Sequence, residues 1–546
     1  MRASWVCRID STSAENHVGA LRPRIMVNTE SFMNGAESLA RTLVAGGVDV
    51  CFANPGTSEM HFVAALDRVE GIRCILGLFE GVVTGAADGY YRVMERPAST
   101  LLHLGPGLAN GLANLHNAKK ARSGIVNVVG EHTTSHRHID APLSADVEAI
   151  ARPMSHWVLT SQSASRVGDE AALAIEAAGS NPGQIATLIL PADISWSPSN
   201  RVGEPRPPTP PRKVAQEAVT AAVEALRDEG PVTLLLGDCA LRGRALELAG
   251  RIAAKTGCRL MSEANNARME TGAGRADAPR YSPNVDAALA AFQDTKRIVL
   301  IGAKLPAAFF GYPGRPSLLA PPQCAVVSTG APGDDLEDAL EAIASELGAL
   351  ATAPRVLQPN SEGIPTGPIT PQGIDAVLAS VVPENAIVVD ESISTGRTLY
   401  PRLRQGRSHD QMNSMGASLG YALPVAIGTS IAAPSRKTIV LSGDGSAMYT
   451  LQSLWTMARE GLDVTVVIFA NRSYEILRGE LKRVGVTSPG RKAQDMLSLD
   501  NPVIDFVKLA QGHGVEAGRT TSLEELHAEM TRGLRSEGPY LIEVIC

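Results

Sequence analysis

Two side chains with hard oxygen atoms, Asp444 and Asn471, stand 27 residues apart in the chain. Asp444 lies in Gly443-Asp444-Gly445 directly after the apolar run 438–441, and Asn471 follows the apolar run 464–469. A carboxylate, an amide oxygen and a nearby backbone carbonyl, with two diphosphate oxygens and a water, would complete an octahedron around Mg²⁺. The pattern therefore predicts a magnesium site that also holds a diphosphate.

The elements that must position these ligands are two strands and the helical stretch 448–460 between them. Such a strand–helix–strand unit is right-handed, and ligands in open α/β sheets bind outside the carboxyl ends of the strands. We therefore expect Asp444 and Asn471 to point into one crevice.

Two residues after the aspartate are expected to meet the phosphate. Gly445 would let the backbone approach it closely, and the amides of Gly445 and Ser446 open a predicted helix, which is a natural anion site. The alternative is that the Gly-Asp-Gly segment is a plain turn and that Asn471 only caps its strand.

Short apolar runs alternate with helical stretches along the whole chain, which is typical of parallel sheets covered by helices on both faces. Two Pro-rich stretches look like linkers. We predict an α/β protein with three doubly wound parallel-sheet domains. The predicted parts are an N-terminal extension (1–30), a first domain (31–196), a linker (197–213), a middle domain (214–350), a linker (351–370) and a third domain (371–546).

Composition excludes several classes of protein. The 546 residues carry a net charge of −7 and contain no basic block, so nucleic acid and anionic membrane are not expected partners. No apolar run approaches the roughly 20 residues that span a bilayer. Seven scattered Cys residues without a CxxC pair predict a reducing cytoplasm rather than a disulfide framework.

The segment from Gly443 to Asn471 resembles the cofactor motif of enzymes that use thiamine diphosphate (ThDP). Residues 419–424 (LGYALP) and 538–544 (GPYLIEV) are similar to the acetolactate synthase and benzoylformate decarboxylase group of that family. The resemblance covers about residues 34–546 and is weak in the middle domain. It implies the ThDP-binding fold, with the pyrimidine held by the first domain and the diphosphate by the third.

The resemblance also implies further cofactor contacts. The backbone carbonyl of Ser473 would be the third protein ligand of Mg²⁺, and Ser394 would contact the cofactor. The backbone of Ala417 and Leu419 would hold the aminopyrimidine, with the Leu419 side chain propping the cofactor into a V shape. Leu419 could equally be plain core.

Glu80 follows the apolar run 74–79 and begins a predicted helix, within a segment that resembles the family's E-x5-A block. By that resemblance, Glu80 is the carboxylic acid that activates the cofactor through its ring nitrogen, as general acid–base catalysis. Alone, a Glu in a first helical turn is usually a surface residue favoured by the helix dipole.

His103 aligns with a histidine that benzoylformate decarboxylases use for proton transfer, although a satisfied core histidine is the alternative. The stretch with which acetolactate synthases bind FAD is missing, so FAD is not expected. The predicted substrate pocket is mostly apolar, favours an uncharged substituent on the substrate, and comprises Thr57, His103, Leu104, Phe309, Ile476 and Leu477.

The prediction for function is a ThDP- and Mg²⁺-dependent carboligase or decarboxylase of 2-oxo acids, similar to acetolactate synthase. A benzoylformate-type decarboxylase, a non-catalytic accessory subunit and a nucleotide-binding oxidoreductase stay open as alternatives. The resemblance further implies a homodimer or homotetramer whose sites are shared between subunits. The particular 2-oxo acid and its acceptor do not follow from the sequence.

Overall fold

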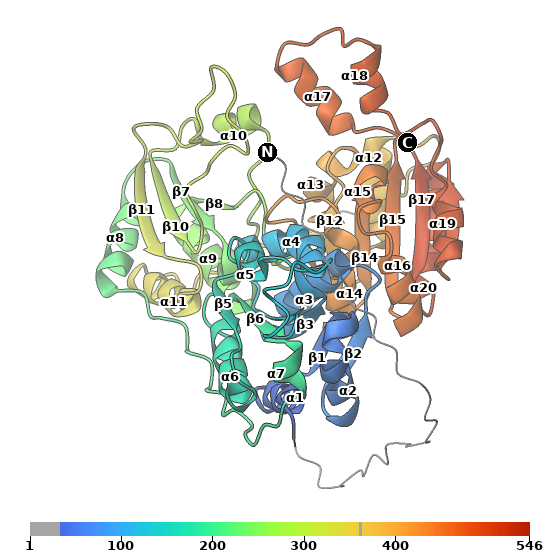
Figure 1. Cartoon of the computed structure of the whole chain (residues 1–546). Coiled ribbons are helices and arrows are strands. Elements are labelled where there is room, and N and C mark those ends of the chain that lie inside the picture. The colour runs from blue at the N-terminus through green and yellow to red at the C-terminus, as the bar shows by residue number, and fades with distance from the viewer. Residues whose placement is uncertain (1–32, 360–362) are drawn as a thin grey trace, which may run out of the picture.

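The computed structural model describes residues 33–359 and 363–546, so the predicted extension 1–30 lies outside the described residues. Three mainly parallel sheets, each flanked by helices, follow one another along the chain (Figure 1). This is the α/β architecture that the alternating apolar and helical stretches predict.

The first sheet has six parallel strands in the order β2-β1-β3-β4-β6-β5. Its strands are β1 (Val50–Asn54), β2 (Arg73–Leu76), β3 (Ala98–Leu102), β4 (Ile125–Glu131), β5 (Trp157–Thr160) and β6 (Ile185–Pro191). Its helices are α1 (Gly35–Ala45), η1 (Thr57–Glu59), α2 (Met60–Arg68), α3 (Glu80–Met94), α4 (Leu104–Ala121), α5 (Val147–Ala151), η2 (Ala164–Arg166), α6 (Val167–Ala178) and α7 (Ala192–Trp196).

The second sheet has four parallel strands in the order β11-β10-β7-β8. Its strands are β7 (Val232–Leu236), β8 (Arg259–Ser262), β10 (Arg297–Ile301) and β11 (Ala325–Gly330). Its helices are α8 (Gln216–Arg227), η3 (Asp238–Leu241), α9 (Gly243–Thr256), α10 (Val285–Phe292) and α11 (Leu336–Glu346).

The third sheet has seven strands in the order β16-β17-β15-β14-β12-β13-β9. Its strands are β9 (Met269–Thr271), β12 (Ala386–Glu391), β13 (His409–Asn413), β14 (Thr438–Gly443), β15 (Val464–Ala470), β16 (Glu516–Thr520) and β17 (Tyr540–Ile545). Its helices are α12 (Pro371–Val381), η4 (Thr395–Thr398), α13 (Leu399–Leu403), α14 (Ala422–Ala432), α15 (Asp444–Ala447), α16 (Ser453–Glu460), α17 (Glu475–Arg483), α18 (Arg491–Met496), α19 (Phe506–Gly512) and α20 (Leu523–Arg535).

Two local features differ from the sequence-based expectation. The sequence predicts one helix over 448–460. The structure instead has the short helix α15 directly after β14, and the helix α16 begins only at Ser453. The strand β9 comes from the predicted middle domain but pairs antiparallel with β13 at the edge of the third sheet. Its three residues carry no periodic signal that could have assigned them to that sheet.

Helices α3 and α14 join the first and third sheets through a close backbone contact. A Cβ atom added at Gly89 would lie 2.1 Å from the carbonyl oxygen of Val425, and one added at Gly428 would lie 1.9 Å from that of Ala86. The glycines therefore let the two helices touch, and one hydrophobic core runs through both sheets.

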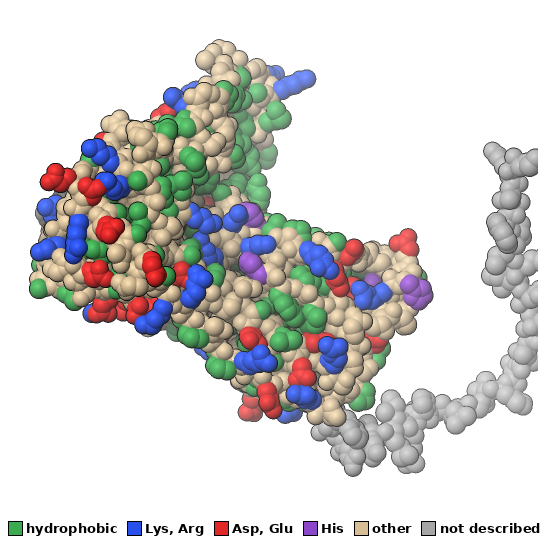
Figure 2. All heavy atoms as spheres, turned by 90° about the vertical axis from the view of Figure 1, so that its left-hand side faces the viewer, with side chains coloured by type: hydrophobic (Ala, Val, Ile, Leu, Met, Phe, Trp, Pro, Cys, Tyr) green, Lys and Arg blue, Asp and Glu red, His purple; other side chains and the backbone are tan. Residues whose placement is uncertain are grey.

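The surface mixes charges. Figure 2 shows acidic and basic side chains interspersed over the face that it presents. In the described part of the chain, no helix is both long enough and apolar enough to cross a bilayer.

Candidate active site

Strands β14 and β15 are parallel neighbours, with Gly443 paired to Phe469. Asp444 follows β14 and is almost fully buried. Its Oδ1 accepts the backbone N–H of Gly445 at 2.8 Å, and its Oδ2 accepts that of Arg472 at 2.6 Å. The carboxyl ends of the two strands thus meet at this aspartate.

Asn471 lies at the same edge. Its Oδ1 accepts the backbone N–H of Ser473 at 3.0 Å, while its Nδ2 donates to Oγ of Ser394 at 3.2 Å and to Oγ1 of Thr395 at 3.4 Å. The structure therefore brings together four residues that the sequence selected, from the ends of β12, β14 and β15.

The donor set fits a cation that is shared with a diphosphate. Burial raises the pKa of the Asp444 carboxyl, against the opposing pull of the Arg472 and Gly445 N–H groups. Within residues 33–359 and 363–546, no Lys, Arg or His side chain forms an ion pair with Asp444, and no group of three or more His, Cys, Asp or Glu could hold a metal. A buried carboxylate beside amide and carbonyl oxygens suits Mg²⁺ with further phosphate oxygens.

The two glycines of the motif have different surroundings. A Cβ atom at Gly443 would meet nothing within 4 Å, so this backbone is open for a ligand. At Gly445 it would lie 2.6 Å from Cε1 of Tyr474. Gly445 is thus required for packing against Tyr474, a reason different from the predicted close approach of a phosphate.

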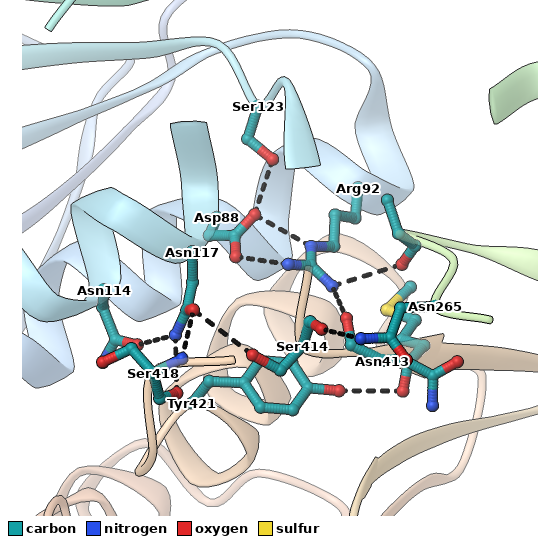
Figure 3. A network of polar contacts seen from close by, with 12 residues as sticks. Asp88, Arg92, Asn114, Asn117, Ser123, Asn265, Asn413, Ser414, Ser418 and Tyr421 are labelled. Atoms are coloured by element: carbon teal, nitrogen blue, oxygen red, sulfur yellow. Dashed lines mark hydrogen bonds and ion pairs between the residues drawn. The ribbon is translucent and has the colours of Figure 1, made fainter. Parts of the chain in front are cut away.

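The loop that precedes α14 is held by helix α4 of the first sheet (Figure 3). Asn117 accepts the backbone N–H of Ser418 at 3.1 Å and donates to its carbonyl at 3.0 Å, and Asn114 donates to the carbonyl of Gly420 at 3.4 Å. Ala417 and Gly420 both adopt positive φ, of 58° and 82°. The loop is thus fixed in an unusual backbone shape from two sides, as a binding loop for a rigid ring would require.

Glu391, at the end of β12, supports this loop from below and was not singled out from the sequence. It accepts the backbone N–H groups of Gly420 at 2.8 Å, Tyr421 at 3.2 Å and Ala422 at 3.3 Å. Burial raises its pKa to about 7. The sequence signal that could have identified Glu391 is an acidic residue at the end of an apolar run. Leu419 is only partly buried and belongs to none of the hydrophobic cores, which favours the propping role over plain core.

Glu80 begins α3 and is 8% exposed. Its Oε2 accepts a hydrogen bond from Nδ2 of Asn110 at 3.0 Å. A Cβ atom added at Gly107 would lie 3.0 Å from Oε1 of Glu80 and 3.2 Å from Cβ of His103. The two predicted catalytic residues therefore lie against the same glycine of α4.

His103 has a partner that sequence reasoning missed. Its Nδ1 lies 2.8 Å from Oε2 of Glu59, at the end of η1. The Glu59 side chain is 1% exposed, and that of His103 is 22% exposed. An acid two residues after Thr57 gave no sign of this contact, because the histidine lies 44 residues away in the chain.

The predicted pocket residues fall into two groups. Thr57 is exposed near His103, whereas Leu104 is completely buried and has a φ of 49°. Leu477 is 45% exposed on α17, beside the partly buried Ile476.

The middle-domain residue of the predicted pocket lies near the second group. Phe309 is exposed in the loop that follows β10. Tyr312 of this loop donates its hydroxyl to Oε2 of Glu480 on α17 at 3.0 Å. Among the described residues, no hydrogen bond or ion pair joins Glu80 or His103 to Asp444 or Asn471. We call the group around Glu80 and His103 the first half-site and the group around Asp444 and Asn471 the second half-site.

One glycine at a strand end of the second sheet is closely surrounded. A Cβ atom at Gly237, after β7, would lie 2.5 Å from the carbonyl oxygen of Gly302 and 2.7 Å from Oε2 of Glu263. The missing side chain of Gly237 thus lets the end of β7 approach Gly302, which follows β10.

Family comparison finds two matches in the chain. Residues 33–154 match the N-terminal TPP binding domain of thiamine pyrophosphate enzymes, and residues 394–544 match the C-terminal TPP binding domain. Both half-sites lie inside these matches, apart from Glu391 and the middle-domain loop.

Individual relatives extend the similarity over nearly the whole chain. A Mycobacterium tuberculosis protein provisionally named acetolactate synthase large subunit IlvX is 47% identical over 94% of this chain and 99% of its own. Benzoylformate decarboxylase of Pseudomonas aeruginosa is 30% identical over 91% and 96%. The solved 4-hydroxybenzoylformate decarboxylase of Rhodococcus jostii shares the fold, with a TM-score of 0.80 at 23% identity over 94% of this chain and 99% of that one.

Proposed function

Since the chain belongs to the family of thiamine pyrophosphate enzymes, of the acetolactate synthase and benzoylformate decarboxylase type, we propose that it decarboxylates a 2-oxo acid with an uncharged substituent. The observation that carries the proposal is the pair of Glu80 and His103 on one glycine, a buried acid beside a partly exposed imidazole. Such a pair can carry out two separate proton transfers in one site.

ThDP, when bound, supplies a nucleophilic carbon and an electron sink for loss of CO₂. Asp444, Asn471 and the carbonyl of Ser473 would hold Mg²⁺ and, through it, the diphosphate, with Ser394 beside them. The backbone of Ala417 and Leu419 would hold the aminopyrimidine.

Each titratable group of the first half-site would then have one task. Glu80 would keep a proton on a ring nitrogen of the cofactor, in a position fixed by Asn110. His103 would deliver a proton from Nε2 to the product, because its Nδ1 is engaged by Glu59. Thr57, Phe309, Ile476 and Leu477 would surround the substrate with few charges, so a second carboxylate would be costly to bury.

The two half-sites support a homodimer or homotetramer in which Glu80 of one subunit serves the metal site of the next. Exposed apolar side chains flank both halves: Leu78 lies two residues before Glu80, and Met448 and Tyr449 lie close after Asp444. A two-fold axis would bring these surfaces together and create two equivalent sites.

Free cysteines at the described positions are in keeping with the proposed cytoplasmic location.

Carboligation is the second candidate, favoured by the 47% identity to the provisionally named acetolactate synthase. Product analysis distinguishes the two. Purified protein with ThDP and Mg²⁺ is given pyruvate or an aryl 2-oxo acid, and the products are separated by gas chromatography. We expect mainly the aldehyde; a 2-hydroxy-3-oxo acid as the main product would establish carboligation instead.

A further inference from the structure

Two groups fix the imidazole of His103. Nδ1 lies 2.8 Å from Oε2 of Glu59, and the same oxygen accepts the backbone N–H of Gly56 at 2.7 Å. A Cβ atom added at Gly56 would lie 2.3 to 2.5 Å from three atoms of the ring. The ring therefore rests on the bare Cα of Gly56, which leaves it little freedom to turn away from the carboxyl group.

The carboxyl group of Glu59 has few other partners. Its Oε1 is buried and has no hydrogen-bond partner in the described part of the chain. A Cβ atom added at Gly130 would lie only 1.6 Å from this oxygen. Burial raises the pKa of Glu59, while the nearby His103 and the N–H of Gly56 act in the opposite direction. Among the described residues, His103 and the N–H of Gly56 are thus the two groups that hydrogen-bond to this buried carboxyl.

We propose that Glu59 is a positioning residue that keeps His103 protonated on Nδ1 and presents Nε2 to the substrate. The inference rests on the proposed function, because it names the group behind the proton donor of that site. The carboxylate would also favour the doubly protonated ring, which can give up the Nε2 proton to the product and regain one from water.

Other charged groups nearby make no contact with this pair. Glu80 lies across Gly107, and Glu131 follows Gly130 with Arg137 at 3.8 Å from its carboxylate. None of the three forms a hydrogen bond or ion pair with Glu59 or His103 among the described residues. The protonation of His103 should therefore depend on Glu59 more than on any other side chain.

The test is Glu59→Gln, which keeps the shape and the acceptor oxygen but removes the charge. A charge partner at this distance shifts proton affinity by about tenfold or more. Because His103 acts as an acid, the alkaline limb of the kcat profile should move about one pH unit lower, and kcat above that limb should fall about tenfold, with ThDP affinity unchanged. In His103→Ala, the further change Glu59→Gln should have no effect on kcat.

Glu170→Gln is the matched control, because Glu170 is also a buried acid of the first domain, on α6, but pairs with Arg166 at the end of η2. It should leave the pH profile unchanged. If Glu59→Gln does not fold, Gly56→Ala offers a second variant, since the added methyl group would displace the ring from Glu59 and should move the same limb.

A second readout separates this inference from the proposed function. NMR spectra of protein with ¹³C-labelled histidine, assigned with His103→Ala, report the titration of this ring without any substrate. A shift of that titration to lower pH in Glu59→Gln supports the inference even if no 2-oxo acid is turned over. A titration and a pH profile like those of the wild type would overturn it.

Discussion

Oδ2 of Asp444 accepts the backbone N–H of Arg472 at 2.6 Å, which ties the end of β14 to the residue next to Asn471. The two proposed magnesium ligands are therefore held by one short contact between neighbouring strands.

Asp444→Ala should abolish Mg²⁺-dependent ThDP binding, because Mg²⁺ would lose its carboxylate ligand from the protein and could no longer hold the diphosphate. Isothermal titration with ThDP in the presence of Mg²⁺ measures this directly. Asp375→Ala is the control: this buried aspartate on α12 accepts the hydroxyl of Thr398 and should leave the affinity unchanged. Wild-type ThDP affinity in Asp444→Ala would refute the metal assignment.

Gly89→Ala should destabilise the protein by about 1–3 kcal/mol, because its Cβ atom would lie 2.1 Å from the Val425 carbonyl in the contact of α3 with α14. Gly479→Ala is matched to it, since Gly479 is also inside a helix but has nothing within 4 Å of an added Cβ. Thermal unfolding should separate the two variants by several degrees. Equal unfolding temperatures would show that the helices can move apart at little cost.

Glu391 gives the cofactor-free protein a pH-dependent stability. Its folded pKa, about 7, lies above the usual value, so the folded protein binds this proton more tightly than the unfolded chain does. The contribution of this group to stability should therefore be complete below about pH 4.5 and be lost, by up to about 3 kcal/mol, as the pH rises to about 7. In Glu391→Gln this part of the slope, measured by urea unfolding between pH 5 and 8, should disappear. An unchanged slope would mean that the carboxyl group is ionised throughout.

Much of the site follows from the sequence, and the reasons are local. Asp444 and Asn471 could be placed together because each directly follows an apolar strand, and parallel neighbours end at one edge. Glu80 was identified through the family resemblance, because a Glu in a first helical turn is usually exposed. The complete burial of Leu104 and its left-handed backbone conformation could not be predicted, because such a conformation at a non-glycine residue has no sequence signature.

Contacts between distant segments were beyond sequence reasoning. Glu59 lies after β1 and contacts His103, which follows the neighbouring strand β3. Glu391 accepts backbone N–H groups about 30 residues later, at the start of α14. Both are acids at positions where a solvent-exposed side chain is the usual outcome. The carboxyl group of Glu59 occupies space left free by Gly130, and that of Glu391 accepts backbone N–H groups of a distant loop, which only the fold reveals.

Shared sites can be tested by complementation. Glu80→Gln and Asp444→Ala chains, each inactive alone, are co-expressed with different tags. If the sites lie between subunits, each mixed dimer contains one intact site, so random pairing should restore about a quarter of wild-type activity. No recovery in mixed dimers isolated with both tags would place each site within a single chain.

The function itself is tested most directly by CO₂ release from purified protein supplied with ThDP and Mg²⁺. A panel of pyruvate, an aryl 2-oxo acid and 2-oxoglutarate covers short, aromatic and charged substituents. We predict faster CO₂ release from at least one 2-oxo acid with an uncharged substituent than from 2-oxoglutarate. In Glu80→Gln, the rate of release should fall about 100-fold or more while ThDP still binds. Preference for 2-oxoglutarate, or undiminished release by Glu80→Gln, would contradict the account.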